Sequence, residues 1–314
     1  MIKSLGRTTF FSALGRGVWF GFFYHFFIYF WFLWLYPLDF TGIGNTTSVL
    51  VVLLAWLGIS LAHGALFALS TLFCHFVEKK FLSRPLALFS SILGILLAQR
   101  IMESSDLAFP WVRVSLGQYR VPFLIQSASL FGIEGLDALI LAISALIALA
   151  LFSNSKKRLT CAFFALLLFS ANALFGILRL TVTTSEEKTI CVTSVQGCIL
   201  SGEKWEKSES ALETYLRLTR ESVTSKTDLV VWPESAVVKN LALHTDLIQK
   251  YQDLSREMGA KMITGCFWQI DGITSNSALY LDSDSTLAPY SKRMLVPFGE
   301  KMPYRASFRV FFRF

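Results

Sequence analysis

The chain has 314 residues and a formal net charge of +7. Hydrophobic residues make up 54% of it and the mean hydropathy is +0.52, a composition too apolar for a water-soluble protein of this length. The positive charge does not indicate nucleic acid, because the polar part of the sequence contains no basic stripe interleaved with aromatic residues. We therefore expect a membrane protein that does not bind nucleic acid.

The apolar residues form long runs with few charges between residues 18 and 180. A helix needs about 20 apolar residues to cross a hydrocarbon core about 30 Å thick. Five runs meet or approach this length, so the sequence predicts a polytopic α-helical membrane domain in residues 1–184. The predicted spans are residues 18–36, 49–77, 86–101, 133–152 and 160–180.

Lysine and arginine residues mark one side of this predicted bundle. They precede the first span and follow the second and fourth: Lys3, Arg7, Arg16, Lys79, Lys80, Arg84, Lys156, Lys157 and Arg158. The opposite loops carry only Arg113 and Arg120. Since cytoplasmic loops hold the excess of Lys and Arg, we expect a cytoplasmic N-terminus. Five spans then place residues 185–314 on the periplasmic side of a bacterial inner membrane.

Two features lie between the third and fourth predicted spans. The stretch around Phe109-Pro110-Trp111 is aromatic and interrupted by Pro and Gly, which favours the membrane interface over the lipid core. An ordinary aromatic belt would have the same composition. Glu134 stands at the mouth of the fourth span, where a structural and a functional role are equally compatible with its residue type.

From residue 185 onward the sequence resembles an ordinary globular protein. Alternating apolar residues predict strands, and residues spaced three and four apart predict helices. The predicted strands are 188–197, 228–232, 261–266, 277–281 and 290–296, and the predicted helices are 203–222 and 241–258, the latter closed by Gly259. This alternation is typical of an α/β fold. With about 130 residues, the segment is expected to be part of a larger sandwich.

Two motifs carry the candidate chemistry. The predicted strand 228–232 leads into Trp232-Pro233-Glu234, and Lys292 is followed by Pro297-Phe298-Gly299-Glu300. A carboxylate can accept a proton from a nucleophile, and a lysine can stabilise the oxyanion of a tetrahedral intermediate. Taken singly, Glu234 could instead be an N-cap carboxylate for a following turn, and Lys292 could be a solvated surface residue. Gly265 and Gly299 are interpreted as turn residues.

The five cysteines show no spacing typical of a metal site. Cys191 and Cys198 could form a disulfide in an oxidising compartment or remain free thiols, and the sequence leaves both open. Cys266 lies before Lys292 with no histidine or helix N-terminus nearby to favour its thiolate, so we do not expect it to be a nucleophile. No metal or cofactor is predicted.

The combined pattern resembles the apolipoprotein N-acyltransferases, bacterial inner-membrane members of the carbon-nitrogen hydrolase (nitrilase) superfamily. The resemblance extends from about Ser12 to Tyr304. The motifs that carry it are Phe109-Pro110-Trp111, Gly132-Ile133-Glu134, Val195-Gln196-Gly197, Lys204-Trp205, Trp232-Pro233-Glu234-Ser235-Ala236, Asn276-Ser277 and Leu295-Val296-Pro297-Phe298-Gly299-Glu300.

The resemblance implies a multi-pass membrane bundle followed, in residues 185–314, by an incomplete periplasmic nitrilase-like α-β-β-α sandwich. It also implies a Glu-Lys-Cys triad in which Glu234 is the general base, Lys292 stabilises the oxyanion and Glu300 supports them. The implied reaction transfers an acyl chain from a phospholipid, through a Cys thioester, to the N-terminal diacylglyceryl-cysteine of an apolipoprotein. The implied partners are thus a phospholipid donor, an apolipoprotein acceptor and the bilayer.

The sequence departs from the family pattern at both ends. Two further N-terminal spans, the half of the catalytic domain that bears the Cys, and a closing C-terminal span have no counterpart in it. We therefore expect no acyl-enzyme from this polypeptide alone. Two alternatives remain open: a non-catalytic membrane remnant that binds lipid or lipoprotein, and a membrane-anchored amidase with water as acceptor.

Overall fold

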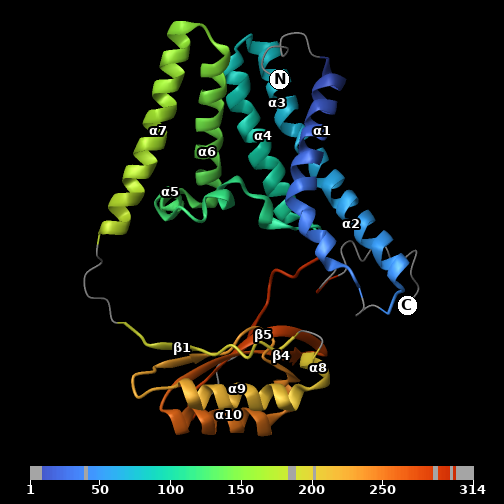
Figure 1. Cartoon of the computed structure of the whole chain (residues 1–314), viewed down its shortest axis with the longest axis vertical. Helices are drawn as coiled ribbons and strands as arrows, with labels where there is room; N and C mark the ends of the chain where they lie inside the picture. Colours follow the sequence, from blue (N-terminus) through green and yellow to red (C-terminus); the bar gives the residue numbers. More distant parts are fainter. Residues whose placement is uncertain are drawn as a thin grey trace. The chain divides into compact units, whose positions relative to one another are not determined.

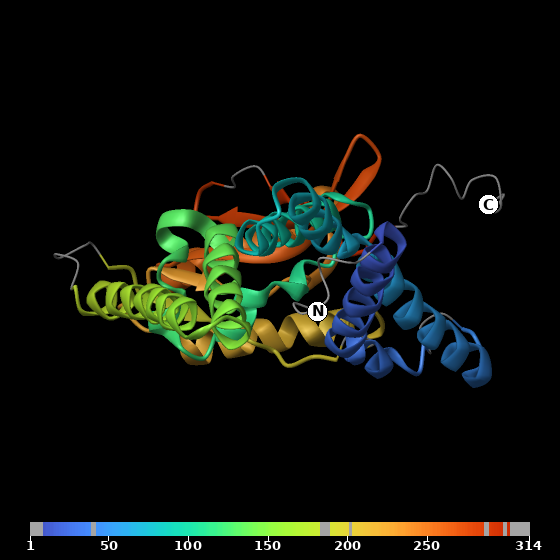
Figure 2. The same ribbon diagram turned by 90° about the horizontal axis from the view of Figure 1, so that it is seen from above.

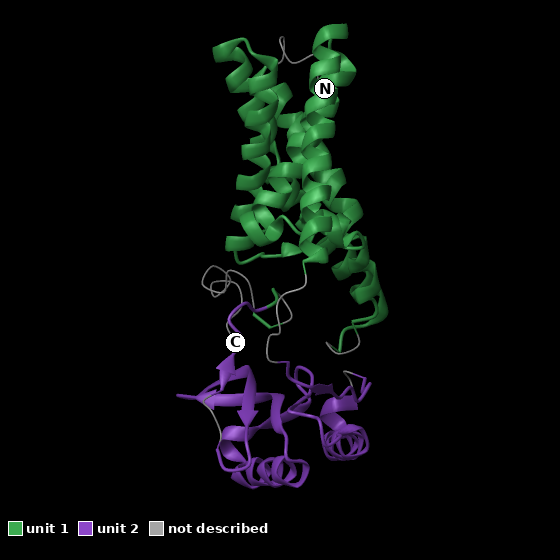
Figure 3. Ribbon diagram, turned by 90° about the vertical axis from the view of Figure 1, so that its left-hand side faces the viewer, with its two compact units in different colours: residues 1–183, 296–314 green, residues 184–295 purple. Residues whose placement is uncertain are grey.

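The computed structural model describes residues 9–38, 42–182, 189–200, 203–285, 289–297 and 300–301. These residues form two compact units, shown in two colours in Figure 3. The helical unit contains the described residues up to 182 together with 296, 297, 300 and 301. The sheet unit contains the described residues from 189 to 295. Each unit is described by itself.

The helical unit confirms the predicted bundle of apolar helices. Its described residues contain five helices long and apolar enough to cross a membrane, and all five begin earlier than predicted. Their bounds are α1 Phe10–Ile28 with its extension η2 Tyr29–Leu35, α2 Asn45–Leu66 with α3 Ala68–Phe81, α4 Arg84–Ser104, α6 Ala128–Phe152 and α7 Ser155–Thr181 (Figure 1).

Close contacts between small residues hold the first helices of this unit together. Where α1 meets α2, a Cβ added to Gly21 would lie only 2.3 Å from the carbonyl oxygen of Gly64. Where α3 meets α4, a Cβ on Gly94 would lie 2.5 Å from the Cα of Ser70. Because lipid tails are as apolar as the helices, such close packing is a main source of helix association in membranes.

The connection from α4 to α6 is irregular and surrounds a buried arginine. It contains η4 Pro110–Val112, η5 Val114–Gln118 and α5 Pro122–Ile125. Arg113, only 6% exposed, makes two 2.6 Å bonds to Glu103 of α4 and 3.0 Å bonds to Glu134 and Asp137 of α6. Asp137 is fully buried, and its other oxygen accepts the Ser115 N–H at 2.8 Å. One guanidinium thus ties the interfacial loop to two spans.

This cluster also gives Glu134 a structural partner. The helix α6 is interrupted at Gly132, whose φ of 69° and ψ of −179° are accessible to glycine but not to other residues without strain. The break turns the chain two residues before Glu134, whose carboxylate accepts an N–H from Arg113. The sequence left a structural and a functional role open for Glu134. The bond to Arg113 is the kind of contact that a structural role requires.

The sheet unit is built on a mixed sheet, as predicted for an α/β fold. The described strands are β1 Val192–Ser194, β2 Leu229–Val231, β3 Val237–Asn240, β4 Lys261–Ile270, β5 Ile273–Leu281 and β6 Tyr290–Ser291. Their order is β1-β2-β4-β5-β6, with β3 paired to β4. The pairs β1–β2, β2–β4 and β3–β4 are parallel. The pairs β4–β5 and β5–β6 are antiparallel. The short strand β3 was not predicted. Residue 188 of the predicted strand 188–197 lies outside the described residues, and within 189–197 the strand is limited to β1.

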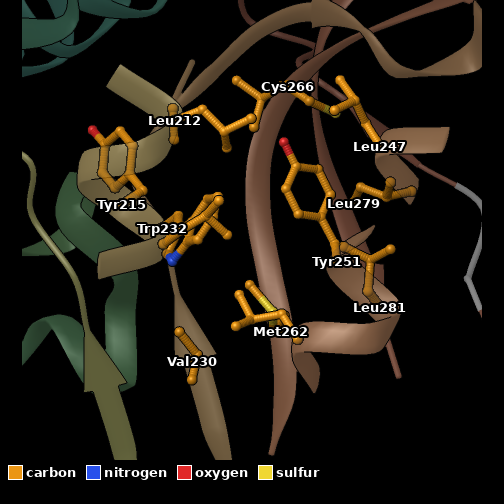
Figure 4. Packing of buried hydrophobic residues seen from close by; sticks show 14 of the residues in the cluster. Leu212, Tyr215, Val230, Trp232, Leu247, Tyr251, Met262, Cys266, Leu279 and Leu281 are labelled. Carbon is orange, nitrogen blue, oxygen red and sulfur yellow. The ribbon is translucent and has the colours of Figure 1, made fainter. Parts of the chain in front are cut away.

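Two amphipathic helices, α9 Ser208–Ser222 and α10 Thr245–Met258, cover one face of this sheet, and a short helix, α8 Glu203–Glu206, precedes them (Figure 1). As predicted, α10 ends at Gly259. Figure 4 shows the core between these helices and the sheet, with Trp232 lying between Tyr215 and Tyr251 at ring-centroid distances of 5.2 and 5.6 Å. The Trp232 indole N–H is satisfied by the hydroxyl of Thr219 at 2.9 Å.

The opposite face of the sheet has a different character. Its side chains, which include Val192, Val231, Ile263 and Tyr280, remain partly or fully exposed within the described chain. Apolar residues on both faces are typical of a strand that is covered on both sides. The arrangement fits one half of the sandwich expected for a carbon-nitrogen hydrolase fold.

The Arg113 cluster generates a stability prediction. Replacing Arg113 with Met leaves the buried carboxylate of Asp137 and the partly buried carboxylate of Glu103 without their counter-ion, which we expect to destabilise the chain by about 3–5 kcal/mol. Thermal unfolding of the purified protein in detergent, followed by circular dichroism, measures the effect. The matched control is Arg120→Met in the same loop, because Arg120 is exposed and bonds only Tyr119 among the described side chains. Equal melting temperatures for the two variants would contradict the structural role of the cluster.

Candidate functional site

Glu234 stands where the chain leaves β2 and crosses the sheet. The strand pairing continues through Trp232, whose N–H donates to the Ile263 carbonyl at 2.8 Å. A turn follows, closed by a 3.2 Å bond from the Ala236 N–H to the Pro233 carbonyl, with Ser235 at a φ of 53°. The described chain thus has a turn and no helix at Glu234, and the carboxylate contacts the side chains of Asn276 and Lys292.

The crossing is possible because β4 has a glycine beneath it. A Cβ on Gly265 would lie 2.5 Å from the Pro233 carbonyl oxygen and 2.7 Å from the Cα of Glu234. The interpretation of Gly265 as a turn residue is therefore wrong. It lies inside β4, where the missing side chain lets residues 233–235 pass directly over the sheet face.

The turn directs the Glu234 carboxylate toward a lysine and an amide. Glu234 Oε1 lies 3.0 Å from Lys292 Nζ and accepts a bond from Asn276 Nδ2 at 2.5 Å. The structure thus brings together two predicted site residues that are 58 positions apart in the sequence. The sequence singled out Asn276 only as part of a motif. Its contacts with both Glu234 and Lys292 were not predicted.

Strand register explains why these three side chains meet. Asn276 pairs with Phe267, two residues beyond Gly265 on β4, and therefore shares the face that Glu234 crosses. The pairing of Ser277 with Ser291 places Lys292 opposite Asn276, and the Lys292 N–H donates to the Asn276 carbonyl at 2.8 Å. The convergence of Glu234 and Lys292 therefore follows from the pairing of β4, β5 and β6.

The pair is accessible from outside. The Glu234 side chain is 61% exposed and that of Lys292 is 30% exposed. An ion pair with this exposure contributes at most about 1 kcal/mol to stability, because water already solvates both charges. Stability therefore does not account for the pair, whereas an open carboxylate beside an ammonium group can perform proton transfer and oxyanion stabilisation.

An aromatic pair borders this site. Trp205, which is exposed, packs its ring on Phe267 with centroids 5.4 Å apart. Phe267 pairs with Asn276 on the same face, so the two rings form an apolar wall next to Asn276, the residue that bonds the Glu234 carboxylate. The Lys204-Trp205 motif was the sequence signal for this wall, but its contact with β4 was not predicted.

Glu300, the third predicted site residue, belongs to the helical unit. Its carboxylate accepts the backbone N–H of Val296 at 2.8 Å and so closes its own turn. The neighbouring Lys301 lies 3.2 Å from Asp106 of the loop between α4 and α6. The predicted support of Lys292 by Glu300 stays a prediction.

Cys266 faces away from the site. It alternates with Gly265 along β4, so its thiol lies on the helix-covered face, fully buried in the core beside Tyr251. Burial raises the pKa of the Cys266 thiol to about 11. Both facts agree with the expectation that Cys266 is not the nucleophile. Among the described residues, no group of three or more His, Cys, Asp or Glu side chains is arranged to hold a metal ion.

Comparison with known proteins agrees with this architecture. Residues 2–146 match the family model described as the apolipoprotein N-acyltransferase N-terminal domain, and residues 191–314 match that described as carbon-nitrogen hydrolase. The sheet unit therefore belongs to the carbon-nitrogen hydrolase class, here joined to membrane helices.

Curated relatives narrow this class to one family. The apolipoprotein N-acyltransferase of Allorhizobium ampelinum is 27% identical over 88% of this chain and 56% of its own length. That of Gloeobacter violaceus is 26% identical over 88% and 53%, and that of Photobacterium profundum is 31% identical over 62% and 38%. The chain belongs to the apolipoprotein N-acyltransferase family. It spans about half the length of the curated relatives it matches.

The placement of the cysteines generates a labelling prediction. With a pKa of about 11, fewer than about one in a thousand Cys266 side chains is a thiolate at pH 7.5, and the core shields the sulfur as well. We expect N-ethylmaleimide to modify the exposed Cys191 and Cys198 in the native protein, and Cys266 only after denaturation or as the pH approaches 11. Peptide mass spectrometry reads out each site. Rapid native modification of Cys266 at pH 7.5 would contradict its placement.

Proposed function

We propose that this protein takes part in the N-acylation of bacterial lipoproteins. The acyl donor is a membrane phospholipid, and the acceptor is the free α-amine of an N-terminal S-diacylglyceryl-cysteine. The observation that carries the proposal is the Glu234–Asn276–Lys292 cluster, open to the outside on one sheet face of a chain that also contains membrane helices. A water-soluble amidase would have no need of those helices, because its substrate does not enter from a bilayer.

In the first stage, the thiolate of a cysteine supplied from outside these 314 residues, as the family resemblance implies, attacks the ester carbonyl of the phospholipid. Glu234 accepts the thiol proton, and the Lys292 ammonium group stabilises the oxyanion that forms on the carbonyl oxygen. The C–O bond then breaks and lysophospholipid leaves as an alcohol, taking the proton from Glu234. Cys266 cannot supply the thiol, because it lies on the other face of β4.

In the second stage, the lipoprotein amine attacks the thioester. The new C–N bond forms as the C–S bond breaks, and the amine proton passes through Glu234 to the departing thiolate. The amide is more stable than the thioester, so the step runs toward product. Asn276 holds Glu234 beside Lys292 in both stages, and the wall of Trp205 and Phe267 provides apolar surface for an acyl chain.

The proposal extends to location and organisation. Residues 1–184 would form a multi-pass domain in the bacterial inner membrane with a cytoplasmic N-terminus, as the Lys and Arg distribution favours. Residues 185–314 would be the periplasmic catalytic part, with Glu300 supporting Lys292. Lateral access of two lipid-bearing substrates then accounts for the attachment of this domain to membrane helices.

Substitution in the source bacterium tests the function. In cells whose gene carries Glu234→Gln or Lys292→Met, we expect N-acylation of lipoproteins to fall at least about a hundredfold, because each change removes a group that acts in the transition state. Mass spectrometry of lipoprotein N-terminal peptides measures the acylated and free-amine forms. Asn276→Ala should give a smaller loss, since it only loosens the position of Glu234.

The control is Lys239→Gln, which removes a lysine that pairs at 3.8 Å with the exposed Glu209. N-acylation that is unchanged by both Glu234→Gln and Lys292→Met would contradict the proposal and favour a non-catalytic membrane protein. Release of free fatty acid in place of acylated lipoprotein would favour the amidase alternative.

A further inference from the structure

The helices α6 and α7 enclose an apolar groove that the proposed reaction does not use. It has a volume of about 640 Å³, within the range of about 300–1,000 Å³ typical of small-ligand sites. Residues from one face of each helix line it: Ile143, Ile147, Ala150 and Leu151 of α6, and Arg158, Ala162, Ala165, Leu166 and Phe169 of α7. The two helices lie side by side in Figures 1 and 2.

Small and large residues alternate to give the groove its shape. Ala150 and Ala165 are buried and form its floor. Larger side chains that remain exposed, Leu151 and Leu166 among them, form its walls. A narrow channel lined by alkyl groups suits a flexible hydrocarbon chain, which can follow it with little loss of contact.

One end of the groove carries a positive charge. Arg158 is the only charged residue in the lining, and the adjacent Lys156 and Lys157 add to the positive potential. The whole of α7 contains no acidic residue that could neutralise Arg158. Basic residues between membrane helices at the membrane surface are typical sites for anionic lipid headgroups.

The length of the groove matches one leaflet. From Arg158 to Phe169 the helix rises about 16 Å, and half of a hydrocarbon core of about 30 Å is about 15 Å. Beyond Phe169 the seam narrows to a smaller cavity of about 110 Å³ with polar residues, among them Gln118 and Asn172. A lipid with its headgroup at Arg158 would therefore end its acyl chain where the apolar lining ends.

We propose that this groove binds an anionic phospholipid, with its phosphate on Arg158 and one acyl chain between α6 and α7. Arg158 lies near the start of α7, about 35 Å along the helix axis from Thr181 at its end, so the bound lipid occupies the first half of this helix. It fills the seam between two helices and stabilises their packing.

Native mass spectrometry of the purified full chain tests this site. Phosphatidylglycerol and phosphatidylcholine with identical acyl chains are added to the protein in detergent, and the retained lipid adducts are counted. We expect a preference for phosphatidylglycerol that Arg158→Gln reduces about fivefold. The matched control is Lys157→Gln, which removes a neighbouring cation outside the groove and should change binding less than twofold. Equal retention of the two lipids, or an unchanged preference in Arg158→Gln, would overturn the proposal.

A second variant tests the groove itself. Ala165→Phe fills the floor and should abolish lipid retention, whereas Leu159→Phe, at an exposed position outside the lining, should not. A crosslinking experiment tests the site in the unmodified protein, so its result does not depend on whether the variant folds. It uses phosphatidylglycerol that carries a diazirine near its acyl terminus. Adducts are expected on peptides from residues 143–169. Adducts spread equally over the other helices would overturn the proposal, as would a lipid-free dimer that Ala165→Phe disrupts.

Discussion

The site depends on the passage of residues 233–235 over Gly265. A side chain at that position of β4 would overlap the backbone of Glu234, so the glycine decides which face of the sheet the carboxylate reaches. Strand register then determines its neighbours, since Asn276 and Lys292 must emerge on the same face. The carboxylate and the ammonium group therefore meet at 3.0 Å through backbone geometry, although the Glu234 side chain is largely exposed and that of Lys292 is partly exposed.

The two units use charge in different ways. In the helical unit, the buried Arg113 pairs with the fully buried Asp137, the partly buried Glu103 and the more exposed Glu134, and so fixes an irregular loop that lipid alone could not stabilise. In the sheet unit, Glu234 and Lys292 form an exposed pair that contributes little to stability and remains available for chemistry. Burial thus separates a charge cluster that holds the fold from one that can act on a substrate.

The sequence predicted those structural elements that depend on a local pattern of hydrophobic residues. Hydropathy over about 20 residues located the spans, and helical spacing located α9 and α10 with the stop at Gly259. The proximity of Glu234 and Lys292 was expected only from the family resemblance, and other contacts between distant residues were not predicted, because their partners leave no local signal. The bond from Asn276 to Glu234 and the convergence of Glu103, Asp137 and Arg113 are of this kind. Gly265 was misinterpreted because glycine is equally typical of a turn and of a close backbone approach.

The convergence of Glu234 and Lys292 on one sheet face can be tested by electron cryo-microscopy of the protein in a lipid nanodisc, at a resolution that shows side chains. We expect Lys292 Nζ and the Asn276 amide to lie within hydrogen-bond distance of the Glu234 carboxylate, directly above Gly265. Density that places the Glu234 and Lys292 side chains on opposite faces of the sheet would contradict it.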